Sequence, residues 1–392
     1  MSDAHVVIIG AGQGGTQAAM SLRQVGYAGP ITLFGDEAGL PYMRPPLSKA
    51  YLKSGEAERL TLRSQSFFDS KGITLRAGQR VDRIDRTARQ VFVAGETIPY
   101  GHLILATGTR NMTPPIKGMA HTMGLRTLED ARCLRAKLDQ PCKVAVIGGG
   151  FIGLEFAAVA RTLGHEVALA EAAPRLMARA VSPQMSAQFA QMHRAQGTCL
   201  YLGNAVAGID AGAITLADGT AIEANFILLA AGVTPNVELA EAAGLNVDNG
   251  IMVDDRLRTS DAHIFALGDC ARFPNPQGGA PVRLESVQAA TDHARAIAKT
   301  ITCGDAGPYG AVPWFWSDQA DWKLQIAGLA GVNDDSVAVC ETTILRFDGA
   351  RLSAVETINN AKTHMKARRI FALPGAPSRD MLAQKDYDLS AF

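Results

Sequence analysis

The chain has 392 residues with 38 basic and 38 acidic side chains, so it carries no formal net charge, and its length predicts two or three domains. The balanced charge argues against a nucleic-acid or anionic-membrane partner, and no apolar run reaches the ~18 residues that span a bilayer. Because the N-terminus enters an apolar strand without a basic leader, we expect a cytoplasmic protein.

The first predicted unit opens with an apolar strand that runs into a glycine-rich turn. Val6–Ile9 are followed directly by Gly10-Ala11-Gly12-Gln13-Gly14-Gly15. In such a strand–turn–helix segment the glycines permit a tight turn, close approach to a pyrophosphate and close helix packing, and the helix N-terminus favours phosphate. Asp36, just after the strand Ile31–Phe34, is placed to accept hydrogen bonds from a ribose.

A second unit repeats this pattern. Val144–Ile147 are followed by Gly148-Gly149-Gly150-Phe151-Ile152-Gly153, and Glu171 follows the strand Val167–Ala170. One such glycine pattern is weak evidence, whereas two with an acid after the next strand are strong evidence. The repetition predicts two dinucleotides held so that electrons can pass between them.

Each of three later strands ends in a turn of small residues. Leu103–Gly108 closes the first unit, Phe226–Gly232 closes the second, and His263–Cys270 returns the chain to the first. Ser286–Ile301 has the apolar spacing of a helix. The two halves therefore share a weak internal duplication.

The composition changes from about Ala306 onward. All three tryptophans, Trp314, Trp316 and Trp322, lie in this part. Alternating segments such as 336–343 and 343–347 predict a small antiparallel sheet, with a terminal helix or loop.

The six cysteines form no CxxC or similarly close pair. We therefore expect small buried side chains or inert thiols and no disulfide relay. They are Cys133, Cys142, Cys199, Cys270, Cys303 and Cys340.

Motifs along nearly the whole chain resemble the FAD-dependent NADH:ferredoxin reductases of oxygenase systems, the family of putidaredoxin reductase and the biphenyl-dioxygenase ferredoxin reductases. The matching segments are 10–15, 41–49, 126–130, 148–155, 232–236, 268–272, 284–287 and 313–319. The resemblance implies an α/β, glutathione-reductase-like fold. Residues 1–107 and 233–305 would bind FAD, 108–232 would bind NADH, and 306–392 would form a small α+β C-terminal domain.

The implied function is electron transfer from NADH through FAD to a [2Fe-2S] ferredoxin, which supplies a terminal oxygenase. We expect a monomer or homodimer without a metal site of its own. One alternative is a rubredoxin or small-oxidant reductase of the same fold, and a less favoured one is a non-enzymatic signalling flavoprotein.

The resemblance assigns roles to three residues at the reacting groups. Lys49 would place its ammonium near the flavin N5 edge, Glu155 would face the nicotinamide and contact Lys49, and Trp316 would lie at the flavin edge toward the docking surface. The ordinary alternatives are a surface lysine, a favourable acid at a helix N-terminus and a core aromatic residue.

Further cofactor contacts also follow from the resemblance. Asp269 would bind the FAD ribityl chain or pyrophosphate, and the helix that starts near Val287 would direct its positive end at the flavin through a backbone N–H. The remaining FAD contacts would be Gly10, Gly12, Gly14, Gly15, Asp36, Arg44, Val81, Ala106, Gly108 and Arg126. NADH contacts would be Gly148, Gly150, Gly153, Glu171 and Gly232.

Charge predicts two preferences. Glu171 would repel a 2′-phosphate and so favour NADH over NADPH, although Arg175 and Arg179 lie close enough in sequence to offset this. The segment 361–379 contains five cations and no acid, namely Lys362, Lys366, Arg368, Arg369 and Arg379. It is either a docking patch for an acidic ferredoxin or a solvated helix face.

Overall fold

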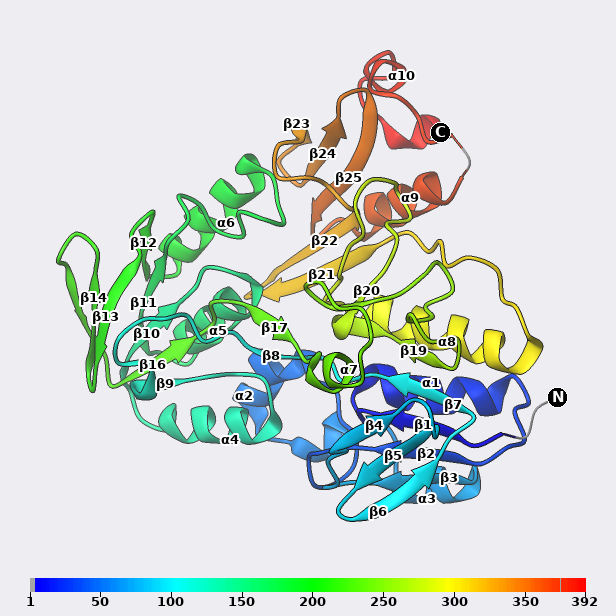
Figure 1. The fold of residues 1–392 in the computed structure, drawn as a ribbon. Helices are drawn as coiled ribbons and strands as arrows, with labels where there is room; N and C mark the ends of the chain where they lie inside the picture. The colour runs from blue at the N-terminus through cyan, green and yellow to red at the C-terminus, as the bar shows by residue number, and fades with distance from the viewer. Residues whose placement is uncertain (1–3, 374) are drawn as a thin grey trace. The chain divides into compact units, whose positions relative to one another are not determined.

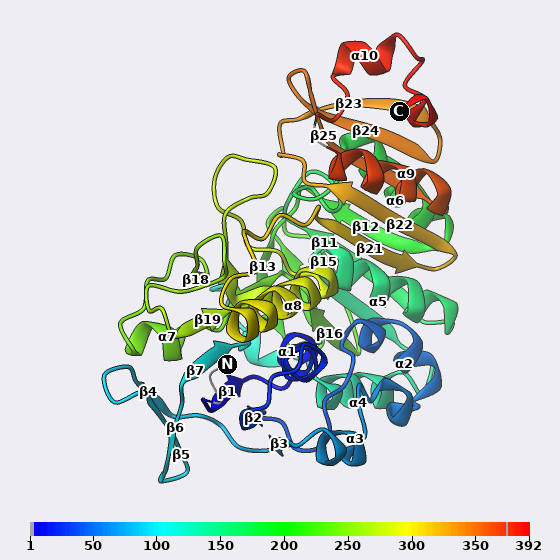
Figure 2. The same cartoon turned by 90° about the vertical axis from the view of Figure 1, so that its right-hand side faces the viewer.

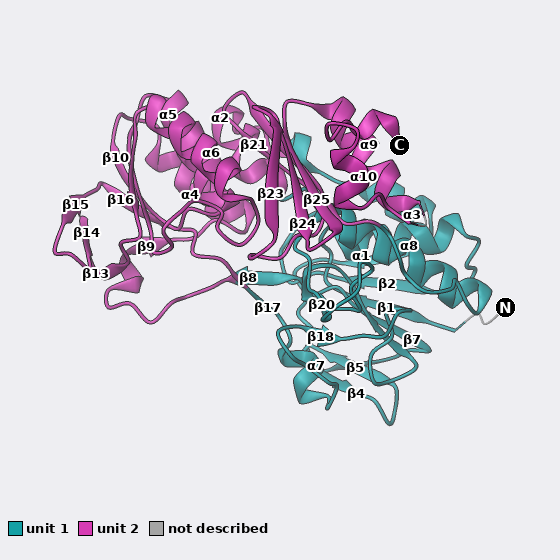
Figure 3. Cartoon of the chain, turned by 90° about the horizontal axis from the view of Figure 1, so that it is seen from above, with its two compact units in different colours: residues 1–44, 58–110, 234–311 teal, residues 45–57, 111–233, 312–392 magenta. Residues whose placement is uncertain are grey.

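The computed structural model describes residues 4–373 and 375–392. The chain divides into two compact units, each assembled from three separate stretches (Figure 3). Unit 1 comprises residues 1–44, 58–110 and 234–311, and unit 2 comprises residues 45–57, 111–233 and 312–392. The segment Pro45–Ala57, which carries Lys49, thus belongs to unit 2. The three-domain limits expected from the resemblance stay a prediction.

Unit 1 is built on a five-stranded parallel sheet (Figure 1). Its strand order is β19 (Ile264–Ala266), β7 (His102–Leu105), β1 (Val6–Ile9), β2 (Ile31–Phe34) and β3 (Ile73–Arg76). Ile9 at the end of β1 pairs with Phe34 and with Leu105. This register places the first glycine loop, Asp36 and the turn after β7 at one edge of the sheet, where parallel sheets bind ligands.

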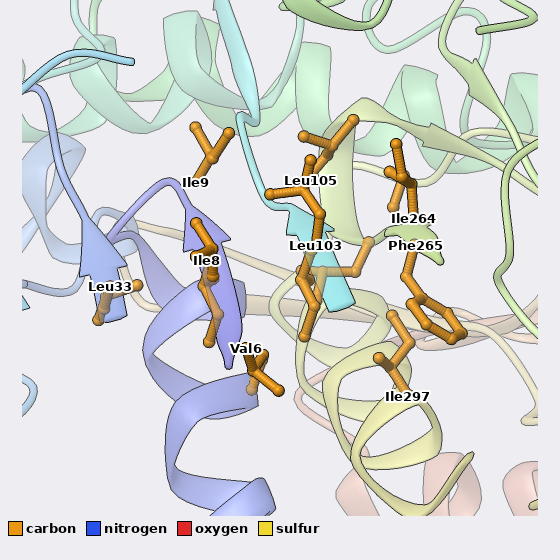
Figure 4. Packing of buried hydrophobic residues seen from close by; sticks show 14 of the residues in the cluster. Val6, Ile8, Ile9, Leu33, Leu103, Leu105, Ile264, Phe265 and Ile297 are labelled. Carbon is orange, nitrogen blue, oxygen red and sulfur yellow. The ribbon is translucent and has the colours of Figure 1, made fainter. Parts of the chain in front are cut away.

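Helices α1 (Gln13–Gln24) and α8 (Val287–Cys303) lie side by side in unit 1 (Figure 2). Strands β1 and β2 at the centre of the sheet are buried along their whole length, as expected where both faces of a parallel sheet are covered. Val6, Leu103 and Ile297 belong to the resulting core (Figure 4). The helix predicted at 286–301 is confirmed, and the Ser286 hydroxyl caps it by accepting the Ala289 N–H.

Smaller elements complete unit 1. An antiparallel sheet contains β4 (Arg83–Asp85), β5 (Gln90–Val93) and β6 (Glu96–Pro99). The others are α3 (Gln65–Ser70), α7 (Glu238–Ala242), β18 (Ile251–Met252), β20 (Ala271–Arg272), the 3-10 turn η4 (Gly268–Cys270), and η2 (Ala57–Leu60) at a unit boundary. The chain passes between the units through β8 (Thr109–Asn111) and β17 (Val233–Pro235), among other crossings.

Unit 2 repeats the strand–loop–helix–strand arrangement. Its parallel sheet has the order β12 (Thr198–Leu202), β11 (Glu166–Glu171), β10 (Lys143–Ile147), β16 (Phe226–Leu229) and β9 (Thr122–Met123). Its helices are α2 (Ala50–Ser54), α4 (Leu128–Lys137), α5 (Phe151–Thr162) and α6 (Pro183–Ala195), with the 3-10 turns η1 (Pro45–Ser48) and η3 (Met119–His121). A small antiparallel sheet contains β13 (Val206–Asp210), β14 (Ala213–Leu216) and β15 (Ala221–Glu223).

The C-terminal part of unit 2 is the antiparallel sheet expected from the alternating segments. Its order is β21 (Trp314–Gln319), β22 (Trp322–Gly328), β25 (Arg351–Ile358), β24 (Thr343–Asp348) and β23 (Asp335–Cys340). Helix α9 (Ala361–Ala372) packs on β22 and β25 (Figure 2), and α10 (Arg379–Ala383) and η5 (Leu389–Ala391) follow. The predicted α/β fold with two Rossmann-type sheets and an α+β C-terminal part is confirmed.

Candidate active site

The first glycine loop has the geometry of a phosphate cradle. Gly10 has φ +109°, and a Cβ there would overlap the Ala106 carbonyl oxygen. A Cβ on Gly15 would overlap the Gly10 carbonyl, and one on Gly14 would overlap the Leu267 side chain. Around Gly12, in contrast, no atom lies within 4 Å of a built Cβ. Three glycines therefore serve close packing, and Gly12 leaves the open space that a pyrophosphate needs.

Asp36 and Arg44 lie beyond the end of β2. Asp36 is exposed. The Arg44 guanidinium lies 2.5 Å from the Glu37 carboxylate, which also accepts the Tyr42 hydroxyl at 2.5 Å. Arg44 thus fixes the loop after β2, and Asp36 is exposed for a ligand.

Asp269 lies in η4, the 3-10 turn that follows strand β19. Its carboxylate accepts the Thr109 hydroxyl at 3.3 Å, and its carbonyl accepts a hydrogen bond from Arg283 at 3.1 Å. Val287 is the first residue of α8 and is half-buried. These residues belong to unit 1, as do the half-buried Ala106 and Gly108 that follow β7.

Val81 and Arg126, the two other predicted FAD contacts, have structural roles of their own in the fold. Val81 is 2% exposed within the core of unit 1, so its side chain serves packing. Arg126 belongs to unit 2, where its backbone N–H donates to the Asp130 carboxylate at the start of α4. Their assignment to FAD stays a prediction.

The second glycine loop repeats the first. Gly148 has φ +112°, Gly153 packs against the Gly148 carbonyl, and no atom lies within 4 Å of a Cβ built on Gly150. Gly232, with φ +115°, is half-buried after β16. Both loops therefore combine a close-packed turn with one glycine that has open space around it, and this arrangement fits a dinucleotide pyrophosphate.

Glu171 has a part in the second loop that the sequence did not reveal. Its carboxylate accepts the Gly149 N–H at 2.6 Å and the Ala173 N–H at 2.7 Å. The nearby Arg175 guanidinium is bound to the carbonyls of Ala178 and Val181, at 2.6 and 2.8 Å. The Arg175 guanidinium is therefore occupied by hydrogen bonds to backbone carbonyls, whereas Arg179 is exposed.

Lys49 and Glu155 form an ion pair inside unit 2. The Lys49 ammonium lies 2.6 Å from Glu155 Oε2, and the side chains are 19% and 5% exposed. Lys49 is not a surface lysine, because the turn η1 directs it inward and its ammonium also donates to the Pro45 carbonyl at 3.0 Å. Glu155 lies one residue beyond the first turn of α5, slightly deeper than predicted.

The Glu155 carboxylate has two more donors. Ser48 Oγ donates to Oε2 at 2.5 Å, and Ser317 Oγ donates to Oε1 at 2.7 Å. Ser317 is followed by Gln319, whose amide donates to Ser317 Oγ at 3.2 Å and whose oxygen lies 2.9 Å from His193 Nε2. Burial lowers the pKa of His193, with the bond to Gln319 opposing this.

The sequence reasoning missed these serines, the glutamine and the histidine as site residues. Ser317 and Gln319 could have been found, because they alternate with Trp314, Trp316 and Asp318 along the strand segment 314–319 and so lie on one face with Phe315. Phe315 packs on Phe151 of α5, and Ser317 bonds to Glu155 on the same helix. Trp314 and Trp316, with ring centroids 5.6 Å apart, alternate with these residues along β21 and share its other face.

Trp314 carries a cation on its ring. The Arg368 guanidinium of α9 lies 4.5 Å from the ring centroid, and the His364 ring lies 6.0 Å away. Lys362 and Arg369 on the same helix are exposed, and Lys366 is half-buried. Four of the five cations of the segment 361–379 thus lie on α9, whereas Arg379 is the first residue of α10.

The cysteines differ in part from the expectation. None forms a disulfide, but only Cys270 is buried, and four of the six are exposed. Among residues 4–373 and 375–392, no group of three His, Cys, Asp or Glu side chains is arranged to hold a metal ion. Within the same residues, no helix has both the length and the apolar character needed to cross a membrane.

Comparison with known proteins identifies the class of oxidoreductase to which this site belongs. Residues 4–294 match the pyridine nucleotide-disulphide oxidoreductase family, and residues 314–392 match the reductase C-terminal family. The chain belongs to the pyridine nucleotide-disulphide oxidoreductase family. It is therefore an FAD- and nicotinamide-dependent oxidoreductase, as predicted.

Three similar proteins agree with this assignment over nearly the whole chain. Rhodocoxin reductase of Rhodococcus erythropolis is 46% identical over 98% of this chain and 93% of its own. The ferredoxin reductase for the CYP199A2 system of Rhodopseudomonas palustris has a TM-score of 0.93 and 43% identity, covering 99% of both chains. The putidaredoxin reductase in its covalent complex with putidaredoxin has a TM-score of 0.93 and 36% identity, covering 100% of this chain and 98% of the other.

Proposed function

We propose that this protein is a cytoplasmic NADH:ferredoxin oxidoreductase that passes electrons through FAD to a [2Fe-2S] ferredoxin supplying an oxygenase. The observation that carries the proposal is the pair of glycine cradles, one in each unit, on a chain whose similar proteins include ferredoxin reductases. Bound FAD accepts a hydride from NADH and releases the electrons singly.

The first cradle, with Asp36 and Asp269, would hold FAD. The second, with Glu171, would hold NADH. Both assignments rest on the family order of the motifs together with the open glycines, Gly12 and Gly150. At each loop the helix N-terminus supplies backbone N–H groups to the phosphates, and neither helix has an acidic residue in its first turn to oppose them.

The ion pair of Lys49 and Glu155 would serve the reacting groups. Lys49 is held as a cation at a fixed point by a carboxylate and a carbonyl, and such a cation favours electron-rich reduced flavin. Glu155 would orient the nicotinamide rather than remove a proton, because hydride transfer depends on alignment at about 3–3.5 Å. Its carboxylate already accepts from three side chains, which suits a positioning role better than a proton-transfer role.

The test is an acceptor panel with the purified FAD-loaded protein and NADH. We expect rapid reduction of a [2Fe-2S] ferredoxin and of ferricyanide, and slow reduction of rubredoxin. If rubredoxin is reduced faster than every ferredoxin in the panel, the result favours a rubredoxin reductase of the same fold. A folded protein that takes up no FAD would contradict the proposal at its first step.

A further inference from the structure

A continuous line of polar side chains runs from Glu155 into the interior of unit 2. It passes through Ser317 and Gln319 of β21 to His193 of α6, with distances of 2.7, 3.2 and 2.9 Å. All three residues are 0% exposed. Buried polar side chains contribute less to stability than apolar ones of similar volume unless every bond is made, so a line of three calls for a reason beyond packing.

The direction of each bond follows from the groups. A carboxylate only accepts, so Ser317 donates its hydroxyl proton to Glu155 Oε1. The lone pair left on Ser317 Oγ then accepts from the Gln319 amide, which leaves the Gln319 oxygen to accept from His193 Nε2–H. Every proton in the line therefore points toward Glu155, and bonds aligned in this way polarise one another.

Ser317 holds a different oxygen of the Glu155 carboxylate from the one held by Ser48 and Lys49. Ser48 and Lys49 both bind Oε2 of the Glu155 carboxylate, whereas the recorded partner of Oε1 is Ser317. A carboxylate held at one oxygen can still pivot about that oxygen when several side-chain torsions change together, whereas two oxygens held at separate points fix its plane. The orientation of Glu155 therefore depends on Ser317, and that of Ser317 on Gln319.

Gln319 also reaches toward the second glycine loop. Its amide nitrogen lies 3.7 Å from the Met177 sulfur, and the Met177 backbone N–H donates to the Gly149 carbonyl at 2.9 Å. Gln319 thus contacts Ser317, which holds the Glu155 carboxylate, and also Met177, which is bonded to the loop proposed to hold NADH.

We propose that Ser317, Gln319 and His193 are positioning residues that fix the plane of the Glu155 carboxylate for hydride transfer. This inference rests on the proposed function, because it assumes that Glu155 orients the nicotinamide. The neutral His193 ring carries its proton on Nε2 and donates it to the Gln319 oxygen. This bond keeps the Gln319 amide from flipping by 180°.

The experiment compares Ser317→Ala and Gln319→Met with the wild type and with Ser186→Ala. Ser186 is a matched control, since it is 1% exposed on α6 and its hydroxyl has no hydrogen-bond partner among the described residues. Anaerobic stopped-flow mixing with NADH gives the limiting rate of flavin reduction and the dissociation constant of NADH separately. Crystal structures of the variants show the Glu155 carboxylate directly.

We expect both variants to lower the limiting rate by about 10-fold to 100-fold, the range for misplacement of a reacting group, while the dissociation constant changes by less than about 3-fold. Glu155 should be turned or present in two orientations in the crystal structures. Ser186→Ala should behave as the wild type does. If Ser317→Ala does not hold FAD, the near-isosteric Ser317→Cys, a weak donor, should show the same slow reduction.

The inference is overturned if the limiting rates equal that of the wild type, or if Ser186→Ala slows reduction as much as Ser317→Ala does. A Glu155 carboxylate unmoved in both variants would also overturn it. Failure of the proposed function is recognised separately, because the wild-type flavin would then not be reduced by NADH at all.

Discussion

At the scale of single residues, Glu171 combines two tasks that a substitution can separate. It anchors two backbone N–H groups of the second loop, and its charge would repel a 2′-phosphate. We expect at least about a 10-fold preference for NADH over NADPH in kcat/KM, and Glu171→Gln should narrow it by removing the charge while keeping an acceptor oxygen.

Arg175 and Arg179 supply the control for this prediction. Arg175→Ala should leave NADPH use unchanged, because that guanidinium is bound to two backbone carbonyls. Arg179→Ala should lower residual NADPH use if the exposed side chain meets the phosphate. Equal kcat/KM values for both cofactors in the wild type would contradict the role of Glu171.

His293 of α8 makes stability depend on pH. Burial lowers its pKa to about 3 from 6.5, and its Nδ1 accepts the Gly268 N–H at 3.2 Å. The unfolded chain binds a proton at this site below about pH 6.5, whereas the folded protein does not. The stability contributed is therefore fully present above that pH and is lost as the pH falls toward 3, by up to about 4–5 kcal/mol.

His293→Gln tests this dependence, because glutamine offers an oxygen to the Gly268 N–H without a group that titrates. We expect urea unfolding between pH 6.5 and 4 to show a shallower fall of the free energy of unfolding in the variant. A residual slope should remain, since burial also lowers the pKa of His193 and lowers that of His364 to about 4. Identical slopes would show that His293 does not contribute.

The sequence alone could predict those site residues whose role depends on contacts within one short segment of the chain. The crowding at Gly10 and Gly15 comes from contacts within one strand–turn–helix segment and the adjoining strand, and the motif reports it. The bond between His193 and Gln319 joins residues 126 positions apart and depends on how α6 and β21 are placed within unit 2. Nothing local marks His193, so only the fold reveals it.

At the scale of elements, one buried cluster joins the C-terminal sheet to α6. Arg346 of β24 lies 3.0 Å from Glu356 of β25, and their side chains are 2% and 0% exposed. Glu356 also accepts the N–H and hydroxyl of Ser182, the N-cap of α6, at 2.7 and 2.6 Å. Burial raises the pKa of Glu356, while Ser182 and Arg346 oppose that rise.

We expect Glu356→Leu to destabilise the protein by about 3–5 kcal/mol, because it leaves the Arg346 charge buried without its carboxylate. The double variant Arg346→Met with Glu356→Leu should recover much of that loss, since two apolar side chains leave no charge unpaired. Urea denaturation of the three proteins measures both. Additive losses in the double variant would contradict coupling through the ion pair.

Strand and helix positions were predictable where a pattern was long or capped. Ser286 caps the N-terminus of α8, close to the helix start that its sequence indicated, and the strands before both glycine loops lie where the aliphatic runs placed them. Pro45–Ala57 was different, because its assignment to unit 2 arises from contacts with distant elements such as α4 and α5. The sequence placed Lys49 in a turn without showing which unit that turn joins.

At the scale of the whole molecule, electron transfer to a protein partner requires a docking surface on this chain. Helix α9 carries four cations and no acid, and Arg368 stacks on Trp314 in β21. We expect the double variant Lys366→Glu/Arg369→Glu to slow ferredoxin reduction, most strongly at low salt, while NADH-to-ferricyanide activity is unchanged. Trp316→Ala should slow ferredoxin reduction in a way that salt cannot reproduce.

A charge reversal elsewhere in unit 2 controls for net charge. Arg132→Glu/Lys137→Glu changes the charge equally on the exposed side of α4 and should leave ferredoxin reduction nearly unchanged. If both double variants slow the reaction alike, long-range charge explains the effect. If the α9 variant has no effect and no change in salt dependence, α9 is only a solvated face.

The central claim is that electrons leave this chain singly, from a flavin reduced by NADH, without a protein disulfide. It is tested most directly by an anaerobic titration of a [2Fe-2S] ferredoxin with NADH, using catalytic amounts of the FAD-loaded protein with all six cysteines replaced by serine. We expect two equivalents of reduced ferredoxin per NADH, at a rate close to that of the wild type. A folded, FAD-loaded variant that is reduced by NADH but passes no electrons to ferredoxin would contradict it.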